Sequence, residues 1–284
     1  MGDVLTGFHT VWEFDTDSVL IRFERGIRTP KLLQVLGERR VPYEALAAVE
    51  QAPGKHGTVV LRAVPRPGAD PLIEAADGRL KEGSDPYRLV LPAEREPLAA
   101  YYADEIRSAL GPAAGEPAER HLVAAPAPPL SFKAYDGKAS FDGSAVHFRW
   151  FWTGASSTKW KAGDQRFPVA ALAGVRWCSP DSPEGGHLRL LPRGDTDRPA
   201  AEPDQDLASV VFGRGYGLVH ESLPFAAAVL AAVRAATAAP PVSSARPDPG
   251  GIADRIRHLG ALHEAGLLTD DEFSSKKAEL LAEL

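Results

Sequence analysis

The sequence is poor in residue patterns that carry metal, redox or hydrolytic chemistry. Its one cysteine, Cys178, follows Trp177 and can form no disulfide within the chain; we expect it to be packed rather than reactive. The eight histidines show no His-x-His or His-Glu-x-x-His spacing, and the motif Cys-x-x-Cys is absent. A Gly-x-Ser-x-Gly elbow and a phosphate-binding loop are also missing. We therefore expect no enzyme and no cofactor.

Long apolar runs are missing too. No run reaches the roughly 18 apolar residues that a membrane-spanning helix needs, and the nearest, residues 223–233, contains Pro224 and stops at Arg234. The N-terminus has no basic segment followed by an apolar core, so we expect no signal peptide. A formal charge of −6 argues against a nucleic-acid partner. We expect a cytoplasmic protein without stable membrane insertion, although peripheral membrane contact stays open.

An internal repeat is the main feature that is present. Residues 40–49 return as residues 166–175, with Arg, Pro, Ala-Leu-Ala and the final Val in register. Phe14-Asp15 returns as Phe141-Asp142, and Arg107 returns as Arg234. Self-similarity over this length indicates a duplicated domain. We predict a first copy at 7–111, a Pro/Ala-rich linker at 112–131, a second copy at 132–237, a Pro/Ser linker at 238–250 and a C-terminal helical hairpin at 251–284.

Each copy shows strand patterns followed by a helix pattern. Trp12 and Phe14 alternate with acidic residues, residues 15–18 are typical of a tight turn, and residues 19–23 alternate again, which predicts a hairpin. Residues 58–64 and 87–91 predict further strands. The helix patterns use Leu98, Tyr101 or Tyr102, Ile106 and Ala109, and later Phe225, Val229, Val233 and Ala236. These patterns predict an α+β fold in which one helix closes a bent antiparallel sheet in each copy.

Three stretches admit two interpretations. Val146, Phe148, Trp150 and Trp152 are expected on one strand face, which leaves Phe151 either at an inter-domain contact or in an exposed patch. Residues 126–129 are expected to belong to a semi-extended spacer rather than to a ligand for a proline-recognition domain. The glycines of residues 213–217 indicate a loop before a strand or helix rather than a dinucleotide site.

A group of basic residues lies ahead of and within the repeated block. It consists of Arg22, Arg25, Arg28, Lys31, Arg39 and Arg40. The matching region of the second copy holds Lys159, Lys161 and Arg166. Such a patch could meet anionic lipid headgroups or peptides. The other interpretation is a solvated basic face balanced by nearby carboxylates, because the whole chain is acidic.

The tail has the pattern of two short amphipathic helices. Thr269 and Glu272 form a capping box at the start of the second one. A hairpin of this size is too small to bury an adequate core alone, so we expect it to dock on a second copy, on a partner protein or on its own chain. The predicted contact residues are Ile256, Leu259, Leu262, Leu267, Leu268, Phe273, Leu280 and Leu281.

These motifs resemble known bacterial families. The hairpin, the block Val41-Pro42-x-x-x-Leu46-Ala47-x-Val49 and the strand-then-helix ending resemble a pleckstrin-homology-like domain. The tandem arrangement, with Leu-Pro-Phe-Ala-Ala-Ala-Val-Leu at 223–230, is similar to actinobacterial domain of unknown function 4429. Residues 251–284 resemble the short C-terminal (SHOCT) domain, which implies oligomerisation or protein contacts. The resemblances imply an interaction or scaffold protein, or alternatively a module that binds anionic lipids or peptides.

Overall fold

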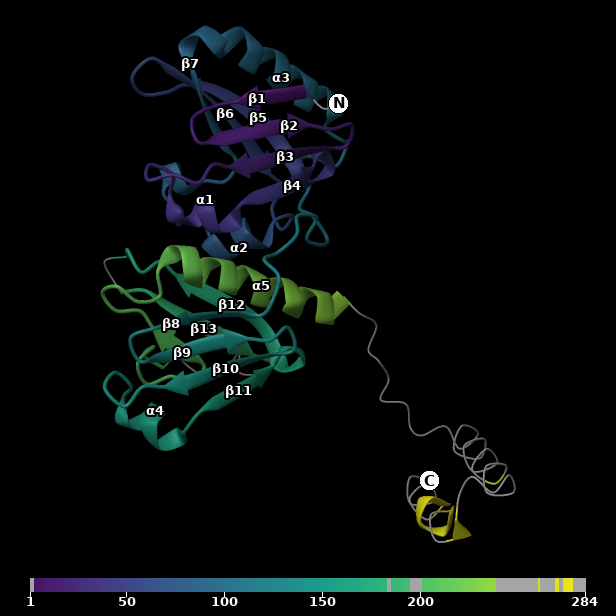
Figure 1. The fold of residues 1–284 in the computed structure, drawn as a ribbon, viewed down its shortest axis with the longest axis vertical. Helices are drawn as coiled ribbons and strands as arrows, with labels where there is room; N and C mark the ends of the chain where they lie inside the picture. The colour runs from purple at the N-terminus through teal and green to yellow at the C-terminus, as the bar shows by residue number, and fades with distance from the viewer. Residues whose placement is uncertain are drawn as a thin grey trace. The chain divides into compact units, whose positions relative to one another are not determined.

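The computed structural model describes residues 3–182, 185–194 and 201–238, and in the tail residues 260, 269, 270 and 273–277. The chain divides into two compact units, Met1–Ala236 and Thr237–Leu284. The strands of both sequence copies belong to the first unit (Figure 1).

The first copy is built from two antiparallel sheets and three α-helices. Its elements in chain order are β1 (Asp3–Thr6), β2 (Thr10–Phe14), β3 (Ser18–Phe23), α1 (Lys31–Leu36), β4 (Glu38–Pro42), β5 (Leu46–Pro53), β6 (Thr58–Pro65), α2 (Pro71–Ala76), β7 (Arg88–Pro92) and α3 (Glu96–Ala109). One sheet has the order β1-β2-β3-β4 and the other β5-β6-β7. The predicted hairpin is confirmed: β2 pairs with β3, and the Asp15 N–H donates to the Ser18 carbonyl at 2.9 Å.

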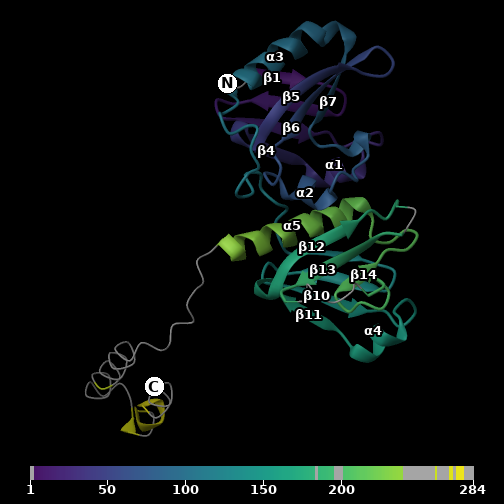
Figure 2. The ribbon, with the colours of Figure 1, turned by 180° about the vertical axis from the view of Figure 1, so that it is seen from behind.

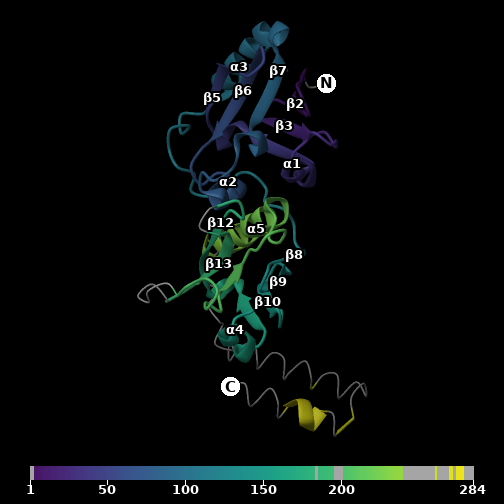
Figure 3. The same ribbon diagram turned by 90° about the vertical axis from the view of Figure 1, so that its left-hand side faces the viewer.

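The second copy repeats this plan. Its elements are β8 (Leu130–Lys133), β9 (Gly137–Phe141), β10 (Ala145–Trp150), α4 (Ser157–Ala162), β11 (Gln165–Pro168), β12 (Leu172–Cys178), β13 (His187–Pro192), β14 (Ser209–Val211) and α5 (Val219–Ala238). The sheets have the orders β11-β10-β9-β8 and β12-β13-β14. Figure 3 shows the two sheets of each copy as facing layers, and the predicted α+β class is confirmed.

Corresponding residues of the two copies make the same backbone contacts. The Arg66 N–H donates to the carbonyl of Ala45 at 2.8 Å, and the Arg193 N–H donates to that of Ala171 at 2.8 Å. A short 3₁₀ turn (Tyr43–Ala45 and Val169–Ala171) connects the sheets in each copy. An irregularity in strand register follows each turn, between Leu46 and Ala48 and between Leu172 and Gly174. The predicted duplication is therefore confirmed by geometry.

The core of each copy lies between its two sheets, and the helix at the end of the copy contributes to it. In the first copy Trp12 and Ile21 meet Leu61 and Leu89 from the facing sheet. Of the residues expected on the inner face of α3, Tyr102 and Ile106 are buried, whereas Leu98 and Tyr101 are exposed.

Helix α5 is apolar along most of its length. Its buried side chains include Leu223, Phe225, Val229 and Val233. Figure 2 shows the helix running past α2 of the first copy. Among the described residues it alone is long and apolar enough to cross a membrane by length and composition, and half of that stretch is buried in the protein. Burial of this kind is what a core helix of a globular domain shows.

The segment that joins the copies is docked rather than extended as a spacer. The Ala118 N–H donates to the Pro67 carbonyl at 2.8 Å, and the Leu122 and Val123 N–H groups donate to the Ala69 carbonyl. Ala118 and Val123 are buried against the first copy. The Pro- and Ala-rich composition predicted a semi-extended spacer, and a pattern of that kind does not reveal these backbone contacts.

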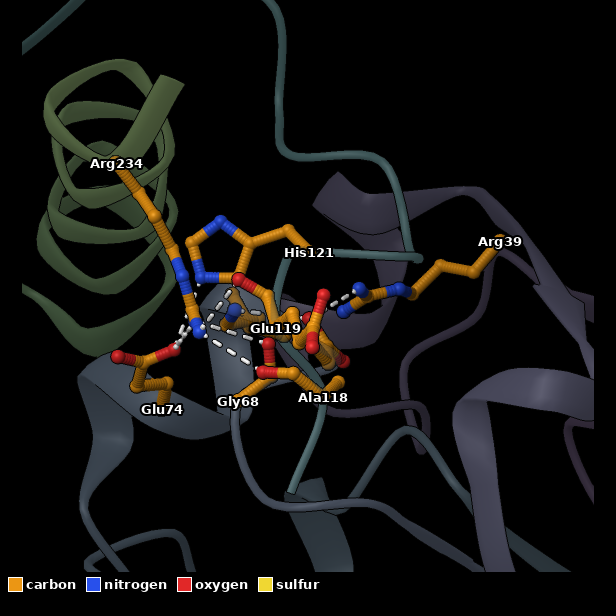
Figure 4. Close-up of polar contacts among 9 residues, drawn as sticks. Arg39, Gly68, Glu74, Ala118, Glu119, His121 and Arg234 are labelled. Carbon is orange, nitrogen blue, oxygen red and sulfur yellow. Dashed lines mark hydrogen bonds and ion pairs between the residues drawn. The ribbon is translucent and has the colours of Figure 1, made fainter. Parts of the chain in front are cut away.

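Helix α2 contacts the second copy. Leu72, Ala75 and Ala76 share an apolar cluster with Trp177 and Leu223. The polar side of this contact is the Arg234 guanidinium on α5, which donates to the carbonyls of Gly68 and Ala118 and pairs with Glu74, each at 3.0 Å (Figure 4).

Glu74 also receives a contact from the linker. Its Oε2 lies 2.9 Å from Nε2 of His121. This hydrogen bond, together with the charges of His121 and Arg234, lowers the pKa of the Glu74 carboxyl against the opposing effect of burial. Residues of α2, the linker and α5 thus join in one polar contact between the copies.

Candidate interaction surface

Three of the six predicted basic residues are bound to carboxylates of the first copy. Arg22 pairs with Glu13 and Glu38, and Arg40 pairs with Asp15. Arg39 is only 6% exposed, so it does not belong to a surface patch. These three side chains support the interpretation of a balanced basic face.

Arg39 is held inside the first copy by a buried polar group. Its Nη2 donates to Asp70 Oδ1 at 2.8 Å, and Tyr87 donates its hydroxyl to Asp70 Oδ2 at 2.7 Å. Asp70 also caps α2 by accepting the Leu72 N–H, and burial raises the pKa of Tyr87 well above its ordinary value. The sequence-based predictions missed this helix start, although the dipeptide Asp70-Pro71 is a signal for it.

The other three basic residues are exposed, and in the sequence they flank one exposed apolar residue. Arg25, Arg28 and Lys31 form no ion pair among the described residues. Ile27, in the connection between β3 and α1, is fully exposed at 106%. The amide of Gln34 donates to two carbonyls of this connection and fixes its shape. We call this group, Arg25, Ile27, Arg28 and Lys31, the Ile27 loop.

The corresponding connection of the second copy also exposes apolar side chains. We expected Trp152 on the inner face with Trp150, but β10 ends at Trp150 and Trp152 is 77% exposed. Its ring lies 6.3 Å from that of Trp160 on α4, which is 51% exposed. Phe151 is half-buried. The expectation for Trp152 was wrong because the strand stops two residues earlier than the alternation suggested.

Lys159 is a buried ion, although we expected it in the basic region of the second copy. It is 0% exposed, and its Nζ donates to Asp136 Oδ2 at 2.6 Å and to the carbonyls of Pro203 and Ser209 at 2.7 Å each. All three N–H bonds of the ammonium are thus used. The corresponding position of α1 is Leu33, which is also buried.

Asp136 is bound from two sides. Its Oδ1 accepts the N–H of Val211 at 3.0 Å, while Oδ2 faces Lys159. Burial raises the pKa of the Asp136 carboxyl, and the hydrogen bond and charge of Lys159 oppose that rise. The sequence signal for this pair is a lysine at a position where the first copy has leucine.

The tail is described at few of its predicted contact residues. Phe273 is half-buried, its N–H donates to the Thr269 carbonyl at 2.9 Å, and Lys277 Nζ lies 5.5 Å from its ring centre. The other seven predicted contact residues, Ile256, Leu259, Leu262, Leu267, Leu268, Leu280 and Leu281, lie outside the described residues.

Similarity to known families agrees with the duplicated fold. A family model described as a domain of unknown function (DUF4429) matches residues 12–107 and again residues 139–230. The chain belongs to this family. Behind the two DUF4429 segments, a model described as a short C-terminal domain (SHOCT) matches residues 254–281. No curated protein matches the chain.

Proposed function

We propose that the chain is a non-enzymatic bacterial interaction or scaffold protein of the cytoplasm, without a cofactor or a nucleic-acid partner. In this proposal residues 251–284 mediate self-association or partner binding. The observation that carries it is the match of the short C-terminal domain to residues 254–281, after two DUF4429 segments that belong to a separate unit.

We also propose that each DUF4429 copy is a pleckstrin-homology-like domain. Two features support this proposal. Each copy has a four-stranded and a three-stranded antiparallel sheet with the core between them. Each copy also ends in a helix, α3 or α5, that contributes buried side chains to that core.

Light scattering coupled to size exclusion tests the role of the tail. We expect the full chain to be oligomeric and a chain ending at Ala238, the last residue of α5, to be monomeric. Leu259→Glu with Leu280→Glu should give the same result in the full chain, because charges at predicted contact positions oppose burial. Leu98→Glu, at an exposed position of α3, is the matched control. A full chain that is monomeric at all concentrations would refute self-association, and partner binding would then be tested with the tail as bait.

A second function is favoured by the Ile27 loop. This loop combines a fully exposed isoleucine with three cations that form no ion pair among the described residues. Anionic membrane surfaces attract loops of this composition. We propose that this loop makes peripheral contact with anionic lipid headgroups.

Co-sedimentation with vesicles that contain phosphatidylserine tests this contact. Each basic residue near such a surface contributes about 1 kcal/mol, so Arg25→Ala with Arg28→Ala should weaken binding roughly 30-fold. Ile27→Asp should weaken binding as well. Lys133→Ala with Lys138→Ala, two exposed lysines of the second copy, removes the same charge and should have a smaller effect. If the two double variants weaken vesicle binding equally, the loss reflects total charge alone, and the assignment of lipid contact to the Ile27 loop is refuted.

A further inference from the structure

The first copy contains a hollow on the outer face of its second sheet. The connection from β6 to β7, which includes α2, covers part of this face and leaves a cavity of about 630 Å³. That volume lies within the range of pockets that hold small organic molecules. We call it the β6 hollow.

The floor and one wall of the β6 hollow are apolar. Val59 and Leu61 on β6 point into the core, so Val60 between them points to the outer face, together with its cross-strand neighbour Ala52. Ile73 of α2 and Leu80 form the facing wall. The outer face of an exposed sheet is usually polar, so this composition indicates that the hollow receives an apolar group.

The acidic residues at the rim are already paired with bases. Arg62 lies 3.0 Å from Asp85 and 3.7 Å from Glu50, and Arg88 lies 2.9 Å from Glu82. Lys55, in the turn between β5 and β6, also lines the hollow, and its ammonium group has no ion pair among the described residues. The rim therefore offers one unpaired positive charge next to an apolar floor.

We propose that the β6 hollow binds a monomeric medium-chain carboxylate. Its alkyl chain lies on the floor formed by Val60 and Ala52, and its carboxylate pairs with Lys55. Neither the scaffold role of the tail nor the lipid contact of the Ile27 loop is needed for this site.

Helix α2 would respond to the ligand. Ile73 lines the hollow, Leu72 and Ala75 belong to the cluster shared with the second copy, and Ala76 does both. A ligand that fills the hollow therefore supports α2 from the side opposite the second copy. Hydrogen exchange of the α2 amides should slow when the hollow is occupied.

Isothermal titration calorimetry on the full chain tests the proposal, with decanoate at concentrations where it is monomeric. Decanoate should bind roughly tenfold more tightly than octanoate, because two further methylenes are buried. Ala52→Trp should abolish binding by filling the floor, whereas Ala109→Trp, at the exposed end of α3, should leave the affinity unchanged. Hydrogen exchange with and without decanoate should place the protection in α2 and in the β5–β6 hairpin.

Reversal of the rim charge tests the head group. Lys55→Glu should weaken decanoate binding at least fivefold and strengthen binding of decylammonium, while Lys138→Glu, at an exposed position of β9, should change neither. The proposal is overturned if Ala52→Trp retains the decanoate affinity, if decylammonium binds the native chain as tightly as decanoate, or if no protection appears in α2. Retention of folding by each variant is checked by circular dichroism.

Discussion

Replacing Lys159 with leucine should destabilise the second copy by about 4 kcal/mol. The side chain is fully buried, and its three hydrogen bonds of 2.6 to 2.7 Å leave with the ammonium group. Asp136, 2% exposed, then remains as an unpaired buried carboxylate. Removing one partner of a buried ion pair costs about 3–5 kcal/mol. Leucine itself suits the position, as Leu33 does in the first copy.

Urea unfolding followed by tryptophan fluorescence measures this effect. Trp150 is a local reporter, because its ring centre lies 4.8 Å from the Lys159 Nζ. The urea midpoint of the fluorescence change should fall, since both copies belong to one compact unit.

A second substitution separates lost charge from lost packing. Adding Asp136→Asn to Lys159→Leu removes the unpaired charge and keeps an oxygen that accepts the Val211 N–H. About half of the lost stability should return, because a neutral amide costs less to bury than a carboxylate. If the single variant is within 1 kcal/mol of the native protein, or if Asp136→Asn gives no recovery, the assignment of Lys159 and Asp136 as a buried ion pair is wrong.

Three further predictions concern the contact between the copies and two turns. Arg234→Ala should lower the free energy of unfolding by about 2 kcal/mol, because hydrogen bonds from a charged donor are lost. Arg107→Ala, at the corresponding exposed position of α3, should lower it less, and urea titration measures both free energies. Gly154→Ala should lower the thermal midpoint strongly, because its Cβ would lie 2.1 Å from the Tyr135 carbonyl oxygen, and equal midpoints for Gly154→Ala and native protein would contradict this clash. Backbone N–H groups in the β9–β10 turn hold the pKa of Asp142 well below its ordinary value. The stabilising contribution of this carboxylate is therefore present above the unfolded pKa of about 3.9 and is lost as pH falls. In urea titrations between pH 6 and pH 3, Asp142→Asn should lose stability less steeply than the native protein.

The parts of the fold that follow from local patterns were predictable. The hairpin of β2 and β3 comes from alternation around a turn rich in Asp and Ser, and the strand expected at 58–64 is β6 (Thr58–Pro65). The strand expected at 87–91 is β7 (Arg88–Pro92). The duplication was visible because both copies preserve the residues around the 3₁₀ turn that joins the sheets.

Features that depend on distant residues were not predictable in this way. The burial of Lys159 requires Asp136, Pro203 and Ser209, which lie 23, 44 and 50 residues away in the chain. Helices α1, α2 and α4 have six residues each, too few for a clear helical period. The β6 hollow could not be predicted from the sequence. It is formed by the connection between β6 and β7, whose residues show no helix or strand periodicity that would place it over Val60.

The difference between Leu33 and Lys159 bears on misfolding of the tandem chain. Two similar neighbouring domains risk exchanging segments while they fold. A helix α4 packed on the sheets of the first copy would bury the Lys159 ammonium where His9 stands in the place of Asp136. An α1 packed on the second copy would leave Asp136 without its cation. Either exchange would leave one buried charge without its partner, and this cost favours the arrangement in which each helix packs on its own copy.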